Sequence, residues 1–340
     1  MAAIKRGKIY AVQRTKLEEV IPLEVPYSIQ IDICSACNMR CEFCVHSDQK
    51  AVRDANIHWG MMSLELYKHI IDDIKISWVG KAKIKKLKLF QIGEPLLNPH
   101  VCEMVAYAKK ADVADNIEIT TNATLLNKEL NLKLVDAGLD ILNISLNGID
   151  EKQYLRTCNY ELSFEKLLSN ITHFYQNRKN CRMFIKYSDI GYSEWEKTRF
   201  YRLFENICDE IFVETISATL WQDTDVNNKI QNANIGTYGQ EITEKKVCPF
   251  LFTTLIINDQ GMAHLCCVDW KLNHILGDLN KESISDVWNG KRLREYQLLH
   301  LQGYKDKIDI CKNCESLSAN NIDNIDEHAD ELLRRLMKNI

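Results

Sequence analysis

The sequence predicts an α/β fold in which parallel strands alternate with helices, as in an open or closed barrel. Short apolar, β-branched runs alternate with segments of helical periodicity from residue 28 to about residue 216. This alternation is typical of βα units joined by right-handed crossovers. A loop with four cysteines follows the first strand directly, at the strand end where such folds place their chemistry.

Six strands are expected from the apolar runs, with helical segments between them. They cover residues 28–34, 86–92, 116–122, 140–146, 182–188 and 210–216. The helix expected at 63–78 has apolar residues at helical spacing behind Ser63, a favourable N-cap residue. A second helix is expected at 98–111, with Asn98 as its cap and Pro99 in its first turn.

The pattern divides the chain into five parts. Residues 1–25 are too few for a separate domain, and residues 26–217 hold the barrel. The stretch 218–246 is polar and lacks periodicity, which is typical of a linker. A small cysteine-bearing domain is expected at 247–320, followed by a terminal helix within 321–340.

Composition argues against nucleic acid and membranes as partners. The 340 residues include 43 Lys and Arg against 47 Asp and Glu, a formal net charge of −4. This balance gives no electrostatic reason to bind nucleic acid or an anionic membrane. The N-terminal segment has no apolar stretch typical of a signal peptide, and the longest apolar run, 250–257, is too short for a membrane span. We therefore expect a cytoplasmic protein.

The chain has 13 cysteines, which a cytoplasmic protein would keep reduced. Metal ligation or catalysis is therefore expected rather than disulfides. Cys37, Cys41 and Cys44 have the spacing C-x3-C-x2-C, and three such thiolates can hold three irons of a [4Fe–4S] cluster. A structural zinc site would need a fourth ligand. Cys34 is available, but its position at a strand end suits it poorly for joining the loop.

The stretch "CNMRCEFC" (37–44) resembles the signature of the radical S-adenosylmethionine (radical SAM) superfamily. The resemblance implies that the three cysteines hold a [4Fe–4S] cluster whose open iron binds SAM, and that Phe43 packs near the adenine. The stretch "QIGEP" (91–95) is similar to the family's G-G-E-P motif, which contacts the methionine amino group. Ile92 replaces the first glycine of that motif, so Gly93, Glu94 and Pro95 are the residues that carry over.

Two further segments resemble the SAM-binding parts of the same family. The stretch "ITTNATLL" (119–126) implies that Asn122 lies near the ribose or the amino acid part of SAM. The stretch "NISLNGIDEKQYLR" (143–156) implies that Ser145 and Arg156 bind SAM. Each of these residues also has an ordinary explanation, as a surface residue or a turn cap. The order of these motifs and their places at strand ends favour membership of the radical SAM superfamily. The resemblance to that family covers about residues 26 to 216.

The last third of the chain carries a second set of cysteines. Cys248 is followed by twelve residues, then Gly261-x4-Cys266, and later by "CKNC", which contains Cys311 and Cys314. This pattern resembles the opening of the SPASM motif, an extension of radical SAM enzymes that carries auxiliary iron–sulfur clusters. No cysteine follows Cys314. The resemblance therefore implies one auxiliary [4Fe–4S] cluster on these four thiolates, as in the shortened "twitch" version, with a structural zinc site as the alternative.

The resemblance implies a radical SAM oxidoreductase, with flavodoxin or ferredoxin as an expected electron donor. SAM cleavage would give a 5′-deoxyadenosyl radical that takes hydrogen from a carbon of a small polar metabolite, such as a sugar or an aminocyclitol. The auxiliary cluster would accept the remaining electron and a ketone would form. Epimerisation is the variant outcome if a thiol returned the hydrogen, and Cys267 and Cys158 are the candidates. The catalytic base is not identified.

Three other functions were weighed against this one. The first is modification of a peptide or protein, as in ribosomal peptide maturases and sulfatase-activating oxidases; many of these carry a leader-binding domain before the barrel. The second is a molybdopterin-type cyclase, which binds its second cluster with three cysteines where this chain offers four. The third is a non-catalytic zinc protein that uses both cysteine sets for structure.

Overall fold

The computed structural model describes the chain except for residues 1–2, 6–13, 56, 217–219, 227–234 and 339–340. The predicted extension at 1–25, the linker at 218–246 and the terminal helix at 321–340 therefore lie partly outside the described residues. None of the helices in the described part combines the length and apolar character that crossing a bilayer requires.

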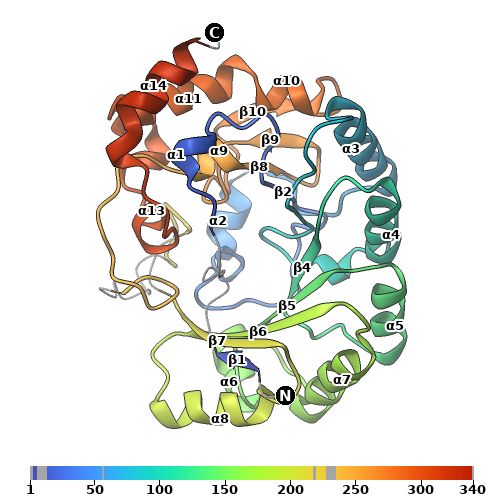
Figure 1. Ribbon diagram of the computed structural model, residues 1–340. Coiled ribbons are helices and arrows are strands. Elements are labelled where there is room, and N and C mark those ends of the chain that lie inside the picture. Colours follow the sequence, from blue (N-terminus) through green and yellow to red (C-terminus); the bar gives the residue numbers. More distant parts are fainter. Residues whose placement is uncertain (1–2, 6–13, 56, 217–219, 227–234, 339–340) are drawn as a thin grey trace.

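The α/β fold class is confirmed. The strands form one sheet in the order β1-β7-β6-β5-β4-β3-β2-β8-β9-β10. The six expected strands are its centre: β2 (Ser28–Ile31), β3 (Lys86–Lys88), β4 (Ile117–Thr121), β5 (Ile141–Leu146), β6 (Arg182–Asp189) and β7 (Glu210–Thr215). Each pairs in parallel with its neighbour. The curved sheet forms a partial barrel (Figure 1).

Helices cover the outer face of the curved sheet (Figure 1). They are α3 (Leu64–Ser77), α4 (Val101–Ala111), α5 (Lys128–Asp136), α7 (Phe164–Asn177) and α8 (Glu194–Phe204). Ser63 caps α3 as expected, because its side chain accepts a hydrogen bond from the Leu66 N–H. The expected cap at Asn98 is wrong. The helix begins after His100, and the Asn98 amide instead donates to the carbonyls of Ile33 and Met62.

The two faces of the strands differ in chemistry. Side chains that point toward the helices are apolar, such as Ile29, Leu87 and Ile144, and they belong to the main core. Successive side chains of a strand point to opposite faces. The alternate positions, such as Lys88 and Glu118, therefore point into the barrel. A mostly polar interior surrounded by an apolar shell follows from this alternation.

The C-terminal part continues the barrel sheet instead of forming a separate sheet. β8 (Thr254–Ile257) pairs in parallel with β2. β9 (Met262–His264) and β10 (Ile275–Asp278) extend the same edge in antiparallel fashion. β1 (Ile4–Lys5) pairs with β7 at the other edge. No local sequence pattern predicts that β8 joins the barrel strands.

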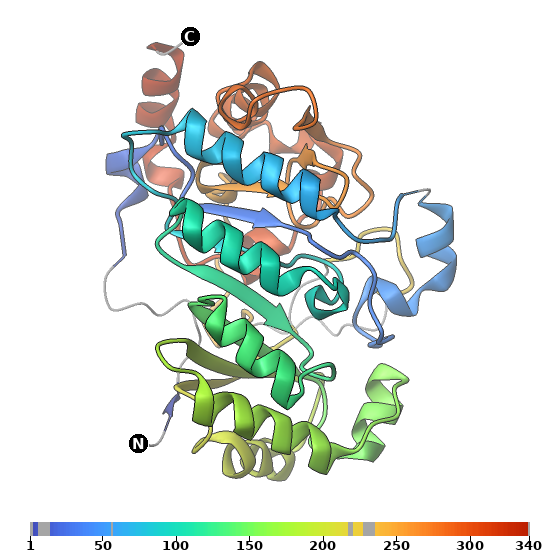
Figure 2. The same cartoon turned by 90° about the vertical axis from the view of Figure 1, so that its right-hand side faces the viewer.

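The remaining helices are mostly short. At the C-terminal side they are α9 (Phe250–Thr253), α10 (Ile284–Trp288), α11 (Lys291–Leu301), α12 (Asp309–Lys312), α13 (Ser316–Ala319) and α14 (Ala329–Lys338). α1 (Leu17–Val20) precedes the barrel, while α2 (Gln49–Asp54) and α6 (Glu151–Cys158) follow β2 and β5. Figure 2 shows α2 and the loop before it beyond the C-terminal end of β2, on the side where the predicted site residues gather.

Candidate active site

The first cysteine loop leaves β2 and is held against the C-terminal end of α6. The Arg40 N–H donates to the Cys158 carbonyl and the Glu42 N–H donates to the Thr157 carbonyl, both at 2.8 Å. Within the loop, the Cys44 N–H donates to the Cys41 carbonyl at 2.8 Å. The loop geometry therefore depends on backbone hydrogen bonds, which do not require a metal.

The structure brings Cys37, Cys41 and Cys44 together. The pKa of the Cys41 thiol is raised by a hydrogen bond with Cys158, by burial and by the nearby thiols of Cys44 and Cys37. Burial raises the pKa of Cys44 to about 12, with a further contribution from Cys37. Three neighbouring, at least half-buried thiols that disfavour one another's ionisation need a cationic partner to become thiolates.

These three cysteines fit a [4Fe–4S] cluster better than a single metal ion. In the described part of the chain, no three His, Cys, Asp or Glu side chains are arranged to hold one ion. Cluster cysteines bind different irons, so their sulfurs lie further apart than the ligands of a single zinc. Three cysteine ligands would leave the fourth iron available for SAM.

Cys34 lies apart from this group. Its thiol donates to the Ala36 carbonyl at 3.4 Å. Burial raises its pKa to about 12, with contributions from Asp32, Glu94 and Asp259 rather than from the other loop thiols. These neighbours agree with the prediction that Cys34 is not a ligand of the cluster.

Gly93 and Glu94 connect the second strand segment to the cysteine loop. A Cβ at Gly93 would meet the carbonyl oxygens of Cys34 and Ala36 at 2.2 and 2.4 Å, so only glycine allows this close approach. The Glu94 N–H donates to the Ala36 carbonyl at 2.9 Å. The expected glycine and glutamate therefore lie directly against the loop, and Pro95 begins the short turn that follows them.

The Glu94 carboxylate is buried and fixed by three donors. Oε1 accepts from the Leu96 N–H and the Thr121 hydroxyl, and Oε2 accepts from the Asn122 N–H at 2.7 Å. Burial nevertheless raises the pKa of Glu94 to about 7. A carboxylate oxygen can accept more than one hydrogen bond, so Oε2 keeps capacity for the ammonium group of a ligand.

Asn122 is tied to the cysteine loop through Asn38, a residue that the sequence interpretation missed. The Asn122 amide donates to Asn38 Oδ1 at 2.8 Å, and the Asn38 amide donates to the Thr124 hydroxyl at 2.9 Å. The chain turns here through Ala123, whose φ of 63° lies in the left-handed region. Asn38 occupies a variable position of the C-x3-C spacing, which explains why the motif did not identify it.

Phe43, Ser145 and Arg156 are the other three residues that are expected to bind SAM. Phe43 is half-buried, and its carbonyl accepts from the Trp221 indole N–H at 2.9 Å. Ser145 is half-buried on β5, at a position that points into the barrel. Arg156 is exposed on α6 and lies near Tyr192 and Glu196. The contacts of these three with SAM remain predictions.

Cys158 is fully buried behind the core loop. Its thiol shares a hydrogen bond with Cys41, and the Asn147 amide also donates to Cys41 Sγ at 3.4 Å. This position suits a supporting contact to a cluster ligand. It weakens the expectation that Cys158 returns hydrogen to a substrate.

The second cysteine set also comes together. Burial raises the pKa of the Cys248 and Cys311 thiols, and the nearby Cys314 thiol raises both further. The pKa of Cys266 is raised by its hydrogen bond with Cys267, by burial and by Cys248 and Cys314. Cys248 precedes α9, Cys266 follows β9, Cys311 lies on α12 and Cys314 follows it. Four convergent thiols fit a fully ligated cluster, whereas no three such side chains in the described part of the chain are arranged to hold a single ion such as zinc.

Cys267 belongs to the same group of thiols and also faces the barrel. It shares a hydrogen bond with Cys266 and lies near the Lys88 ammonium. The sequence predicts Cys267 only as a candidate hydrogen donor for an epimerisation. The structure instead places it between the auxiliary site and the barrel interior.

Several charged residues of the barrel interior were missed by the sequence interpretation. Lys186 forms an ion pair with Glu214 at 2.7 Å. Tyr238 lies near Glu214 and Glu118, and Lys88 lies near Glu118. We call Lys88, Glu118, Lys186, Glu214 and Tyr238 the interior polar group. The alternation of side chains along β3, β4, β6 and β7 could have predicted the four charged members of this group. Tyr238 lies outside the strands, and only the folded chain brings it to them.

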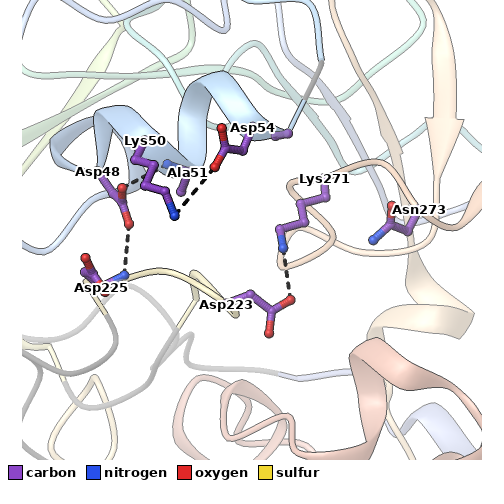
Figure 3. Close-up of a pocket in the computed structure, with 9 residues that line it drawn as sticks. Asp48, Lys50, Ala51, Asp54, Asp223, Asp225, Lys271 and Asn273 are labelled. Atoms are coloured by element: carbon purple, nitrogen blue, oxygen red, sulfur yellow. Dashed lines mark hydrogen bonds and ion pairs between the residues drawn. The ribbon is translucent and has the colours of Figure 1, made fainter.

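A separate pocket of about 410 Å³ lies beside α2 (Figure 3). Its charged side chains are mostly paired with one another: Lys271 binds Asp223 at 3.0 Å, and Lys50 lies 3.8 Å from Asp54. Asp48 caps α2 and also accepts from the Asp225 N–H. These pairs tie α2 to neighbouring loops, so the pocket offers few unpaired charges for a ligand.

Comparison with protein families gives two matches. A model described as the radical SAM superfamily matches residues 31–198, and the SPASM model, described as an iron–sulfur cluster-binding domain, matches residues 248–315. Together they cover both cysteine sets.

Curated relatives are similar over a limited part of the chain. A GTP 3′,8-cyclase of Chlorobaculum tepidum is 35% identical over 127 residues, which are 37% of this chain and 34% of that protein. The tungsten-containing aldehyde ferredoxin oxidoreductase cofactor-modifying protein of Pyrococcus furiosus is 30% identical over 142 residues, 40% of this chain and 35% of that protein. The chain thus matches about a third of the length of these relatives.

Solved structures share the fold over most of the chain. BtrN in complex with AdoMet and 2-DOIA has a TM-score of 0.57 at 16% identity, covering 89% of this chain and 98% of that one. Streptococcus suis SuiB bound to S-adenosylmethionine has a TM-score of 0.61 at 15% identity, covering 89% and 74%. The structure of anSMEcpe with bound AdoMet has a TM-score of 0.57 at 13% identity, covering 92% and 98%.

Proposed function

Because the chain belongs to the radical SAM superfamily and carries a C-terminal SPASM iron–sulfur cluster-binding domain, we propose that it oxidises a carbinol carbon of a small polar metabolite to a ketone. A sugar or an aminocyclitol is the proposed substrate class. Cys37, Cys41 and Cys44 would hold the SAM-binding [4Fe–4S] cluster. Cys248, Cys266, Cys311 and Cys314 would hold one auxiliary [4Fe–4S] cluster, and flavodoxin or ferredoxin is the proposed electron donor.

The chemistry divides between the bound groups and the protein. When bound, SAM and the reduced core cluster supply a 5′-deoxyadenosyl radical, and the auxiliary cluster supplies an acceptor for one electron. Oxidation of a carbinol to a ketone removes one hydrogen atom, one electron and one proton. The residues of the chain must therefore position the carbinol, exclude water and accept the proton.

The observation that carries this proposal is the position of the interior polar group next to the auxiliary site. Lys88 lies near both Glu118 and Cys267, and Tyr238 lies near Glu118, Glu214 and Cys267. Carboxylate, ammonium and phenol groups recognise hydroxyl and amino groups through hydrogen bonds. A polar substrate held by them would lie close to the proposed electron acceptor.

Peptide modification is the second candidate function. The structural likeness to SuiB, which was also solved bound to precursor peptide SuiA, favours it. A peptide substrate would require room beyond the interior polar group. A small metabolite requires only that group, which is why we place oxidation of a metabolite first.

The test uses anaerobically reconstituted enzyme with SAM, dithionite and a panel of sugars and aminocyclitols. We expect 5′-deoxyadenosine together with a product that is lighter by two hydrogens. A variant with Cys311→Ala and Cys314→Ala should still release deoxyadenosine, while ketone formation falls by about 100-fold or more because the electron has no acceptor.

Cys181→Ala with Cys208→Ala is the control, since it also removes two thiols, both buried, but none from either cysteine set. The control should keep both activities. Normal ketone formation without Cys311 and Cys314 would contradict the electron-acceptor role. A product of unchanged mass with inverted stereochemistry would show an epimerase, and modification of a peptide alone would favour the second candidate.

A further inference from the structure

A line of polar side chains leads from the end of β2 to the protein surface. The His58 Nδ1–H donates to Asp259 Oδ2 at 2.6 Å, and the Ser35 hydroxyl lies 3.2 Å from the same oxygen. The Asp259 side chain is 2% exposed, whereas the His58 side chain is 47% exposed. Asp32, which is 2% exposed, lies close enough to Asp259 for the two carboxyls to interact electrostatically. A buried carboxyl pair thus reaches solvent through one imidazole.

The backbone holds this line in place. The Ser35 N–H donates to the Gly60 carbonyl at 2.9 Å, and the Gly60 N–H donates to the Ser35 hydroxyl at 2.8 Å. A Cβ at Gly60 would meet the His58 ring at 2.2 Å, so glycine is required for the ring to lie over this segment. These contacts hold the His58 imidazole beside the cysteine loop.

Asp32 directly follows the C-terminal end of β2, and its N–H still donates to the Ile257 carbonyl at 2.8 Å. By alternation it shares a strand face with Gln30, which pairs with Lys88 across the sheet. Its Oδ1 is buried and has no hydrogen-bond partner among the described residues. A buried carboxyl oxygen without a partner is unfavourable, and a hydroxyl of a bound substrate would satisfy it.

The charges around Asp32 favour a shared proton. Burial and the neighbouring Asp259 raise the pKa of Asp32 to about 7, against the lowering effect of the Ile92 and Cys34 backbone N–H groups. The titratable groups that face Asp32 and Asp259 are the two carboxyls themselves, the Cys34 thiol and the His58 imidazole, and Cys34 also faces Glu94. Two adjacent carboxyls in such a site do not both ionise easily.

We propose that Asp32, Asp259 and His58 form a proton path from the substrate to solvent. This inference rests on the proposed carbinol oxidation. In that reaction the carbon-bound hydrogen atom leaves in 5′-deoxyadenosine and one electron passes to the auxiliary cluster. The hydroxyl proton passes to the Asp32 carboxylate as the C=O bond forms. Asp259 and His58 then carry one proton outward and restore the Asp32 carboxylate.

The first test compares Asp32→Asn with the wild type. Asparagine keeps the size and the backbone hydrogen bonds but cannot accept a proton. We expect deoxyadenosine formation to stay within about two-fold, while ketone formation falls by about 100-fold, the usual contribution of a general base. The infrared band of buried protonated carboxyls near neutral pH should be weaker in Asp32→Asn than in the wild type, because Glu94, whose pKa is also about 7, contributes to the band in both proteins.

The second test compares His58→Gln with His100→Gln. His100 is a matched control, because it is also 47% exposed and also bonded to a carboxylate, Glu103, but directly precedes α4, one of the helices that cover the outer face of the sheet. His58→Gln should lower ketone formation by about ten-fold in weak buffer, and imidazole should restore it by carrying protons. His100→Gln should show neither effect.

The two proposals can fail separately. Wild-type enzyme that cleaves SAM but oxidises no carbinol contradicts the proposed function, while the infrared band still tests the shared proton. Ketone formation at the wild-type rate in Asp32→Asn overturns the proton path and leaves the oxidation intact. An unchanged rate in His58→Gln, with no response to imidazole, overturns the surface end of the path.

Discussion

The two cysteine sites are built in opposite ways. Cys37, Cys41 and Cys44 lie within one short loop, and backbone hydrogen bonds from Arg40 and Glu42 fix that loop to α6. The auxiliary cysteines come from three segments that are separated by up to 66 positions in the chain. A cluster in the first site would occupy a loop that is already shaped. A cluster in the second site would add a link between segments that strand pairing of β8 with β9 and the contact of His300 with Cys248 already bring together, so it should contribute to folding.

The largest expected effect is loss of activity from the core site. Replacing Cys37, Cys41 and Cys44 with alanine should remove about four irons and reduce deoxyadenosine formation below detection, because no iron remains to bind SAM. The melting temperature should fall by only a few degrees, since the hydrogen bonds of the loop remain. Iron analysis, deoxyadenosine assays and circular dichroism measure these three results. A collapse of the barrel in this variant would contradict the preformed loop.

The second expected effect is loss of stability from the auxiliary site. Cys311→Ala with Cys314→Ala should also remove about four irons, but it should lower the free energy of unfolding by roughly 2–4 kcal/mol, the range found when a cross-link that closes a loop is lost. Proteolysis should begin between residues 248 and 319. Equal destabilisation by the core and auxiliary variants would remove the distinction between the two sites.

The difference between a site within one loop and a site assembled from separate segments also explains which residues could be predicted from the sequence. Cys37, Cys41 and Cys44 could be predicted as one set because their spacing is short and follows a strand. Gly93 and Glu94, predicted from a second short motif, lie directly against the same loop. Asn38, the interior polar group and the contact of Cys267 with Lys88 depend on segments that meet only in the folded chain. His58 and Asp259 are 201 positions apart, and no local pattern links them. Pairing of β8 with β2 was missed for the same reason.

Buried histidines behind the two sites give a third, smaller effect. His46 follows the core loop, and His300 contacts the Cys248 N–H at 3.3 Å. Burial lowers the pKa of each to about 4. Between pH 6.5 and pH 4 the unfolded chain binds a proton at each histidine while the folded chain does not, so stability falls as pH falls.

Each histidine should therefore cost about 2 kcal/mol of unfolding free energy between pH 7 and pH 5. His46→Gln and His300→Gln should each remove that share of the pH dependence, which urea unfolding at the two pH values measures. Asp32 and Glu94, whose pKa values are raised, act in the opposite direction but equally in both variants. A pH dependence that is identical in wild type and both variants would show that these histidines are protonated in the folded protein.

The smallest expected effect is that of Cys34→Ala, which tests the boundary of the core site. Cys34 is 1% exposed and its thiol contacts the Ala36 carbonyl, but it lies among carboxyl groups rather than among the loop thiols. Removing its sulfur should leave a small cavity and cost about 1 kcal/mol of unfolding free energy. About eight irons per chain and normal deoxyadenosine formation should remain, whereas the matched variant Cys37→Ala should lose about four irons. Loss of iron from Cys34→Ala with retention in Cys37→Ala would place the ligand at the strand end. The core site would then depend on the pairing of β2 with its neighbours, as the auxiliary site depends on its separate segments, and the contrast between a preformed loop and an assembled site would no longer hold.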